Sequence, residues 1–344
     1  MAALTLFVPG LLGPWSAEAN PPQPHAPALR RMLARGDRLP VELLGFEGAL
    51  ARLFGHQGED LPWAALGLWG ETGQRPEGFV LRLDPVHLKL GMTDAIVFGG
   101  PSLRLSMDEA QALAASVEAH FSELGWRLTV AAPERWYLQA PQAFDLVTTP
   151  LTRALRRDAG LFKPGGADAP RWLAWLTEIQ MLLHAHPVNE AREARGLPII
   201  NHLWPWGAGS IQGLPADFTL TPSPSPIKGE GGMVVFANHP LARGLALASG
   251  LPLHEVPETF AELPLPPSGD VLVVLDEALW PWLSGDMEDW QATVEGLEAR
   301  WFAPVWRKLV WRGVESSVLE FATHQRWILK PIHRWRVWRR TGRV

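Results

Sequence analysis

Short apolar runs alternate along the chain with amphipathic segments, which predicts strands that alternate with helices. Residues 4–8 form an apolar run closed by Pro9-Gly10, and residues 270–275 read DVLVVL, so both are typical of buried strands. Further strands are predicted at 78–83, 95–98, 126–131, 135–138, 199–203 and 233–237. This alternation indicates an α/β fold with a mostly parallel sheet that is covered on both faces.

The longest predicted helix covers residues 106–124. Ser106 is placed to cap its first turn, Asp108 and Glu109 follow where carboxylates are favoured, and Gly125 ends it. Other helices are predicted at 27–35, 48–54, 171–184 and 239–249. The long helix and the strand pair after it predict a small inserted α+β subdomain over 101–145, which leaves 1–100 and 146–344 for the core.

Two segments stand apart from this pattern. Residues 216–232, ADFTLTPSPSPIKGEGG, cannot bury apolar area and are expected to form a flexible surface loop. Residues 330–344, KPIHRWRVWRRTGRV, interleave six basic residues with Trp335 and Trp338. This basic tail is open to three interpretations: an inert solvated end, a contact with a membrane or protein partner, or a contact with nucleic acid.

Composition narrows the class of protein. The 344 residues are 47% hydrophobic and 19% charged, which is typical of a globular chain with a sizeable core. The net charge of −5 and the pI near 6.1 argue against general nucleic-acid binding. The absence of cysteine excludes disulfides and thiolate chemistry and fits a cytoplasmic location. The sequence contains no run of 18 apolar residues, so we expect no transmembrane helix. The apolar segment at its start lacks the basic residues of a secretory signal.

One block carries a resemblance to a known family. Residues 186–209 read HPVNEAREARGLPIINHLWPWGAG. This spaced set resembles the central stretch of archaeal-type, cofactor-independent phosphoglycerate mutases in the alkaline-phosphatase-like superfamily. A proteobacterial subgroup, the RpfE-type regulatory proteins, also shares DPVHL at 84–88 and a strand like PERWYL at 133–138. The resemblance implies an alkaline-phosphatase-like three-layer sandwich with a small α+β insertion.

The same resemblance implies a chemistry whose residues are missing. Mutases of this family use two divalent metals, Mn or Zn, held by carboxylates and imidazoles, and a Ser or Thr nucleophile. The first metal Asp falls on Pro9, and the nucleophile region 45–55 contains no Ser or Thr. The late ligand pairs fall on 275–279 and 317–321, where no His stands beside an Asp.

These vacancies predict a non-catalytic regulatory or binding protein, a pseudoenzyme with no metal, no cofactor and no catalytic residue. Two alternatives stay open. The first is an active 2,3-bisphosphoglycerate-independent phosphoglycerate mutase, or a related phosphatase, with two divalent metals. The second is a membrane or nucleic-acid adaptor that uses the basic tail.

A ligand-binding site is predicted from polar residues near strand ends and in the 186–209 block, because open α/β sheets bind ligands beyond the carboxyl ends of their strands. The set comprises Asp84, His87, His186, Asn189, Arg192, Arg195, Asn201 and Asp276. We expect these side chains to converge on one cleft. The expected partners are a small anionic ligand and a protein, neither of which the sequence names.

Within this set, Arg192 and Arg195 lie three positions apart, so on a helix they share a face. Two guanidinium groups there are suited to hold a phosphate or a carboxylate. In the alternative interpretation, Asn189 and Asn201 brace a buried turn, and the two arginines pair with Glu190 or Glu193.

Overall fold

The computed structural model describes residues 1–12, 23–56, 61–213, 232–311 and 313–339. The chain divides into two compact units. The first unit is formed by 1–59 together with 219–344, and the second by the continuous stretch 60–218.

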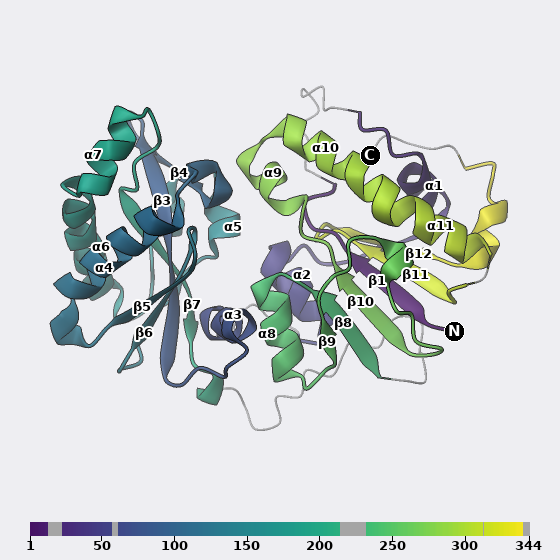
Figure 1. Ribbon diagram of the computed structural model, residues 1–344, viewed down its shortest axis with the longest axis horizontal. Coiled ribbons are helices and arrows are strands. Elements are labelled where there is room, and N and C mark those ends of the chain that lie inside the picture. Colours follow the sequence, from purple (N-terminus) through teal and green to yellow (C-terminus); the bar gives the residue numbers. More distant parts are fainter. Residues whose placement is uncertain (13–22, 57–60, 214–231, 312, 340–344) are drawn as a thin grey trace. The chain divides into compact units, whose positions relative to one another are not determined.

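A mixed, mostly parallel sheet of seven strands forms the centre of the first unit (Figure 1). Its strands are β1 (Ala3–Phe7), β2 (Asp37–Pro40), β8 (Met233–Ala237), β9 (Leu253–His254), β10 (Asp270–Val274), β11 (Ser316–Glu320) and β12 (Gln325–Leu329). They lie in the order β2-β12-β11-β1-β10-β8-β9. All neighbouring pairs are parallel except those that β12 makes with β11 and β2.

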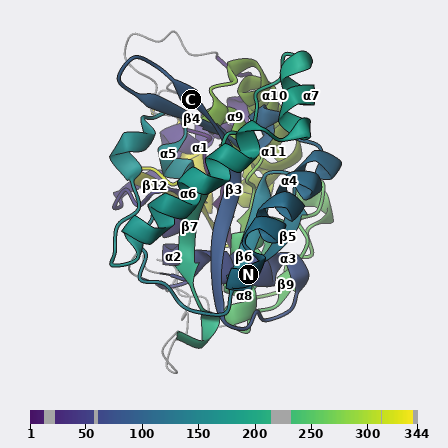
Figure 2. The same cartoon turned by 90° about the vertical axis from the view of Figure 1, so that its left-hand side faces the viewer.

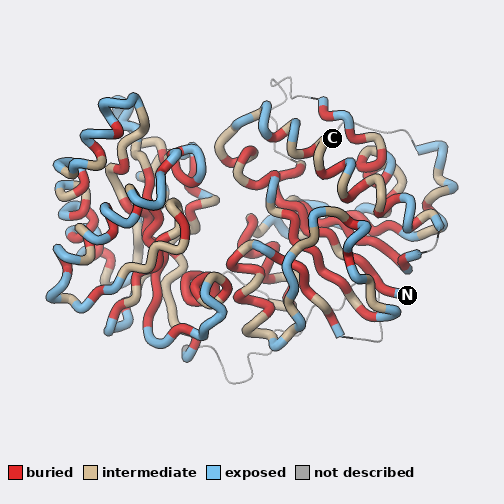
Figure 3. The backbone as a smooth tube through the Cα atoms, in the orientation of Figure 1, coloured by how far each residue is buried: buried red, intermediate tan, exposed pale blue. Residues whose placement is uncertain are grey.

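Helices pack on both faces of this sheet. They are α1 (Pro27–Arg35), α2 (Gly45–Leu53), α8 (Pro240–Ala248), α9 (Leu279–Ser284), α10 (Met287–Leu297) and α11 (Ala303–Val310). Leu4 and Leu6 point into a core shared with α1, α10 and α11. Phe7, on the opposite face, stacks on Phe46 of α2 at 6.0 Å between ring centroids. The strands are accordingly buried along most of their length, as the red tube in Figure 3 shows.

The second unit is built on an antiparallel sheet. Its strands are β3 (Phe79–Leu90), β4 (Ala95–Gly99), β5 (Arg127–Ala132), β6 (Arg135–Ala140) and β7 (His202–Gly209). The order is β4-β3-β6-β5, and β7 also pairs with β3. The long strand β3 therefore contacts three others and organises the unit.

Helices of the second unit bury one face of the antiparallel sheet. The helices of this unit are α3 (Trp63–Thr72), α4 (Met107–His120), α5 (Leu151–Ala154), α6 (Ala169–His184) and α7 (Pro187–Ala194). Figure 2 shows α4 and α6 lying across the sheet, where they share its core. Trp126 stacks on Trp172 at 5.3 Å, and Trp175 packs edge-on against both rings.

The parallel sheet predicted from the sequence is confirmed for the first unit, but not every predicted strand belongs to it. The strands near 78–83, 95–98 and 199–203 lie in the antiparallel sheet as β3, β4 and β7. The second unit, 60–218, is thus wider than the 101–145 expected for an insertion. Nearly all of the loop predicted at 216–232, and residues 340–344 of the basic tail, lie outside the described residues.

Candidate functional site

The carboxyl ends of the parallel strands in the first unit meet in one row. Phe7 lies between Glu320 of β11 and Val274 of β10, and Val274 lies beside Ala237 of β8. This row is where ligands bind in open α/β sheets. Among these four residues, Glu320 is the one with an ionisable side chain, and the parallel edge strand β9 ends nearby at His254, beside Phe236. We call this row and the residues that directly follow it the carboxyl edge.

The turn after β1 is buried and tightly packed against its neighbours. Val8, Pro9 and Gly10 are buried, and the Gly10 carbonyl accepts a hydrogen bond of 2.9 Å from the Trp290 indole. Gly10 has φ +80°, and a Cβ there would lie 2.6 Å from the Ala278 carbonyl oxygen. Pro9 stands where the sequence resemblance expects the first metal Asp, and the proline side chain carries no atom that could bind a metal ion.

Glu320 is held inside the protein by two arginines. Its carboxylate, which is fully buried, accepts from Arg326 Nε at 2.9 Å and lies 3.4 Å from Arg52 Nη2. Burial lowers the pKa of Arg52, and the charge of Glu320 offsets this only in part. A buried charge is stable only when it is paired, so this carboxylate acts in an internal ion-pair group.

The other polar residues of the carboxyl edge also have structural contacts. Asn238 Oδ1 accepts from Val256 N at 3.1 Å, and His239 Nδ1 caps α8 by accepting from Leu241 N at 3.2 Å. Glu277 pairs with Arg300. Asp276, the predicted site residue of this unit, is half-buried. Within the described residues, no three His, Asp or Glu side chains gather closely enough to hold a metal ion.

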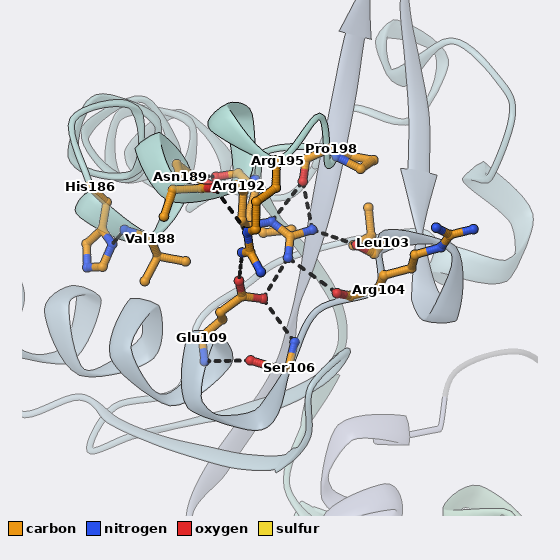
Figure 4. Close-up of polar contacts among 12 residues, drawn as sticks. Leu103, Arg104, Ser106, Glu109, His186, Val188, Asn189, Arg192, Arg195 and Pro198 are labelled. Carbon is orange, nitrogen blue, oxygen red and sulfur yellow. Dashed lines mark hydrogen bonds and ion pairs between the residues drawn. The ribbon is translucent and has the colours of Figure 1, made fainter.

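In the second unit, Arg192 is fully buried and uses all five of its N–H donors (Figure 4). Nε and Nη2 both donate to Pro198 O, at 2.9 and 2.8 Å, and Nη2 also donates to Leu103 O at 2.6 Å. Nη1 donates to Glu109 Oε2 at 2.7 Å and to Arg104 O at 3.4 Å. A guanidinium has five donors, so binding an external anion here requires breaking internal hydrogen bonds.

Glu109 joins the two arginines of the motif. Its other oxygen binds Arg195, whose side chain is 53% exposed, and its carboxylate also accepts from Ser106 N to complete a capping box on α4. Burial raises the pKa of Glu109, but the hydrogen bonds from Ser106 N, Arg195 and Arg192 outweigh it and hold the pKa below its usual value. The arginines thus pair with Glu109, and not with Glu190 or Glu193, which the alternative interpretation of the sequence expected as their partners.

The two asparagines brace the chain before and at the start of β7. Asn189 donates to the carbonyls of Leu183 and Ile200 and accepts from Ile200 N, at 2.7–2.8 Å. Asn201 exchanges two hydrogen bonds with the backbone of Leu88, at 2.7 and 2.9 Å. These contacts are the ones expected of braces for a buried turn.

Both predicted histidines of this unit also contact the framework. His87 Nδ1 lies 2.9 Å from Ile199 O. His186 is the N-cap of α7, where its Nδ1 accepts from Val188 N at 3.2 Å, and Nε2 lies 3.0 Å from Ser116 Oγ. Burial lowers the pKa of His186, which favours its neutral ring.

Asp84 belongs to a separate buried network. It pairs with Arg82 at 2.7 Å and accepts from the Trp206 indole at 2.7 Å and from Trp136 N at 3.3 Å. The Arg82 guanidinium lies between the rings of Tyr137 and Trp206, at 4.7 and 5.0 Å from their centroids. Burial lowers the pKa of Arg82, but Asp84 outweighs it and raises that pKa, so the guanidinium stays charged.

The eight predicted residues therefore do not form one group. Asn189, Arg192 and Arg195 lie around one turn, where both arginines bind Glu109, and His186 caps the helix that leads into it. His87 and Asn201 tie β3 to the chain near Ile199, whereas Asp84 lies in its own network. Asp276 belongs to the first unit. Sequence reasoning missed Glu109 and Glu320 as partners, although the capping-box spacing of Ser106 and Glu109 marks the first of them.

A cavity of about 520 Å³ in the second unit was also missed. It is bordered by the β3–β4 turn, residues 158–164, α6 and β7, and its polar lining includes Asp94, Asp158, Lys163, Thr177, Gln180 and His202. Among the described residues, the buried Nδ1 of His202 has no hydrogen-bond partner. Burial lowers the pKa of His202 to about 4, so its ring is neutral near pH 7. A cavity of this volume is of the size that holds a small molecule.

No protein-family model matches the sequence, and no curated protein matches it either. Among solved structures, the PH0037 protein from Pyrococcus horikoshii matches with a TM-score of 0.54 and 15% identity, over 96% of this chain and 87% of that chain. A cofactor-independent phosphoglycerate mutase from Thermoplasma acidophilum DSM 1728 matches with a TM-score of 0.45 and 16% identity, over 95% of this chain and 89% of that chain. No helix within the described ranges is long and apolar enough to cross a membrane. The chain is thus similar in fold to the PH0037 protein.

Proposed function

We propose that this protein is a non-catalytic regulatory or binding protein on a phosphoglycerate-mutase-like, alkaline-phosphatase-type scaffold. The observation that carries the proposal is the chemistry of the carboxyl edge. The central parallel strands end there at Glu320, Phe7, Val274 and Ala237, and Glu320, the one ionisable residue among these four, is already bound by two arginines. Metal-assisted phosphoryl transfer needs several carboxylates and imidazoles around a nucleophile. The helix α2, where the family resemblance expects that nucleophile, carries no Ser or Thr.

Two further observations fit a scaffold that works without catalysis. The motif shared with RpfE-type regulatory proteins forms a buried brace around Arg192 and Asn189, so these two residues have a structural role that requires no catalytic one. The cavity beside His202 provides a concave, partly polar surface of ordinary ligand size. We infer that this cavity takes a small molecule as a ligand, without any covalent step.

Metal content and turnover test this proposal on the full-length chain. The protein is purified, incubated with Mn²⁺ or Zn²⁺, desalted, and measured for bound metal and for conversion of 3-phosphoglycerate to 2-phosphoglycerate. We expect no stoichiometric pair of metal ions, because the carboxylates and imidazoles of the described carboxyl edge do not gather into a group that could hold one, and we expect no turnover above a blank without protein.

The variants Asp276→Asn and Glu277→Gln are a matched pair of neighbouring carboxylates. Glu277 pairs with Arg300, whereas Asp276 lies where the mutase resemblance expects a ligand. We expect both variants to behave like the parent. Two bound metal ions per chain, together with turnover that Asp276→Asn abolishes and Glu277→Gln retains, would contradict the proposal.

A further inference from the structure

The exposed tryptophans of the described chain are confined to one part of the first unit. Trp311, Trp335 and Trp338 expose 82%, 63% and 72% of their surface, whereas every other described tryptophan is at least half-buried. Ile332 and Val337 are exposed in the same stretch. Scattered exposed apolar side chains need no explanation, but a group of large ones marks an interaction site.

This stretch is held against the first unit by its arginines. Arg334 donates to Val310 O at 2.6 Å, which ties it to the end of α11, one residue before Trp311. Arg336 donates to Arg35 O at 3.0 Å and binds the Asp37 carboxylate. Arg339 donates to Gly36 O at 3.0 Å. We call Trp311 and residues 330–339 the aromatic–basic patch.

The fixed backbone keeps the indole rings in water. The stretch 331–335 forms a short 3₁₀ helix, and Val337 N donates to Trp335 O at 2.8 Å directly after it. The guanidinium of Arg334 lies 4.9 Å from the centre of the Trp335 ring. The anchored segment thus exposes its apolar side chains to solvent. Because its backbone is already ordered in the folded protein, binding costs little further conformational entropy.

The charge of the patch is opposite to that of the whole chain. Residues 321–344 contain no Asp or Glu, and the patch carries Lys330, Arg334, Arg336 and Arg339. The whole chain has a net charge of −5. Asp37 is a carboxylate bound to the patch, and it faces both Arg336 and His333. An excess of cations beside exposed apolar groups favours an anionic partner.

The kind of apolar side chain selects among anionic partners. Nucleic-acid surfaces for single strands rely on flat rings that stack on bases, which Ile332 and Val337 cannot do. At a lipid surface, by contrast, aliphatic side chains enter the acyl boundary, tryptophans lie at the headgroup level, and arginines bind the phosphates. We propose that the aromatic–basic patch docks on the surface of an anionic lipid bilayer.

Sedimentation with vesicles tests this inference on the full-length chain. One set of vesicles contains phosphatidylcholine alone, and the other contains equal parts of phosphatidylcholine and phosphatidylserine. We expect binding to the anionic vesicles only, and a decline as salt is raised, because the attraction is screened. The double variant Trp335→Ala/Trp338→Ala removes two exposed rings and should weaken binding at least about tenfold.

Two more variants complete the design. Lys330→Glu reverses one exposed charge and should weaken binding to the anionic vesicles at least about fivefold. Leu161→Ala/Met181→Ala removes two exposed apolar side chains from the second unit and should leave vesicle binding unchanged. Since all of these positions are exposed, circular dichroism should show the same fold in every variant.

Three outcomes would overturn the inference. They are no binding to anionic vesicles, binding that the tryptophan variant leaves intact, and binding of a single-stranded oligonucleotide that depends on Trp335 and Trp338 while vesicles are not bound. Metal content and turnover do not enter this experiment, so the lipid inference and the proposed function can fail separately.

Discussion

Arg192 and Arg195 lie three positions apart at the end of one short helix and bind the same carboxylate, yet their surroundings differ. The Arg192 side chain is fully buried and makes five hydrogen bonds, whereas the Arg195 side chain is 53% exposed. A buried guanidinium that serves three backbone carbonyls and a carboxylate cannot be replaced by a single ammonium group without leaving acceptors unpaired.

We therefore predict that Arg192→Lys lowers the free energy of unfolding by about 2–4 kcal/mol, because lysine has three donors and no fork geometry. Arg195→Lys, three residues away and paired with the same Glu109, should change it by about 0.5 kcal/mol or less. Urea unfolding followed by tryptophan fluorescence measures both. Equal effects of the two substitutions would show that Arg192 is not the central brace of this turn.

The sequence identified the residues of this brace but not their partners. Arg192, Arg195, Asn189 and Asn201 stand out in the 186–209 block because of their spacing. Their contacts, however, are made with Glu109, which lies 83 residues before Arg192, and with Leu88, which lies 113 residues before Asn201. Such long-range pairing depends on the packing of α4 and β3, which local spacing does not encode.

The sequence predicted the end of a helix or strand well when the interaction that sets this end lies within a few residues along the chain. The start of α4 is set by the capping box of Ser106 and Glu109, and the sequence placed it there. Strand β3 was expected to end near Asp84-Pro85, which normally breaks a strand, but it runs on to Leu90. The expected end was wrong because the charge of Asp84 is paired with Arg82, and its carboxylate accepts a hydrogen bond from Trp206, which lies 122 residues further along the chain.

The turn that follows β1 at the carboxyl edge leads to a prediction about the stability of this element. Gly10 has φ +80°, and a Cβ there would meet the Ala278 carbonyl oxygen at 2.6 Å. Gly250 has φ +63°, but a Cβ there would meet nothing within 4 Å. We expect Gly250→Ala to cost about 1 kcal/mol, from backbone strain alone, and Gly10→Ala to cost at least about 3 kcal/mol.

The same unfolding measurement compares the two glycines, which belong to the same unit. If Gly10→Ala costs no more than Gly250→Ala, the turn after β1 can open, and the carboxyl edge is less closed than its packing indicates. A cost that is larger only for Gly10 supports a turn fixed by its neighbours.

At the scale of the whole molecule, the sequence predicted the kinds of element better than their assignment to sheets. Alternating strands and helices indicated a parallel sheet, which the first unit has. The pattern could not show that β3 pairs with β7, for example Asp84 with Trp204, in an antiparallel sheet of its own. An apolar strand has the same local composition in either sheet, so only the pairing partner distinguishes them.

Because the second unit is a continuous stretch with its own core, we predict that residues 60–218 fold when produced alone. The polypeptide should unfold cooperatively and show strong near-ultraviolet circular dichroism from the stacked Trp126 and Trp172. The same polypeptide with Asp84→Ala is the control, since an unpaired buried Arg82 should cost about 3–5 kcal/mol. A polypeptide that shows helical signal without fixed aromatic signal would refute the prediction.

The order of strands in the first unit has a consequence for how the chain is made. Strand β1 precedes both of its neighbours along the chain, because β10 and β11 begin at residues 270 and 316. At a synthesis rate of about 5–20 residues per second, roughly 15 to 60 s separate the apolar segment Ala3–Phe7 from its second partner strand. During that time it has neither of its partner strands, while the continuous stretch 60–218 has already been synthesised and can fold.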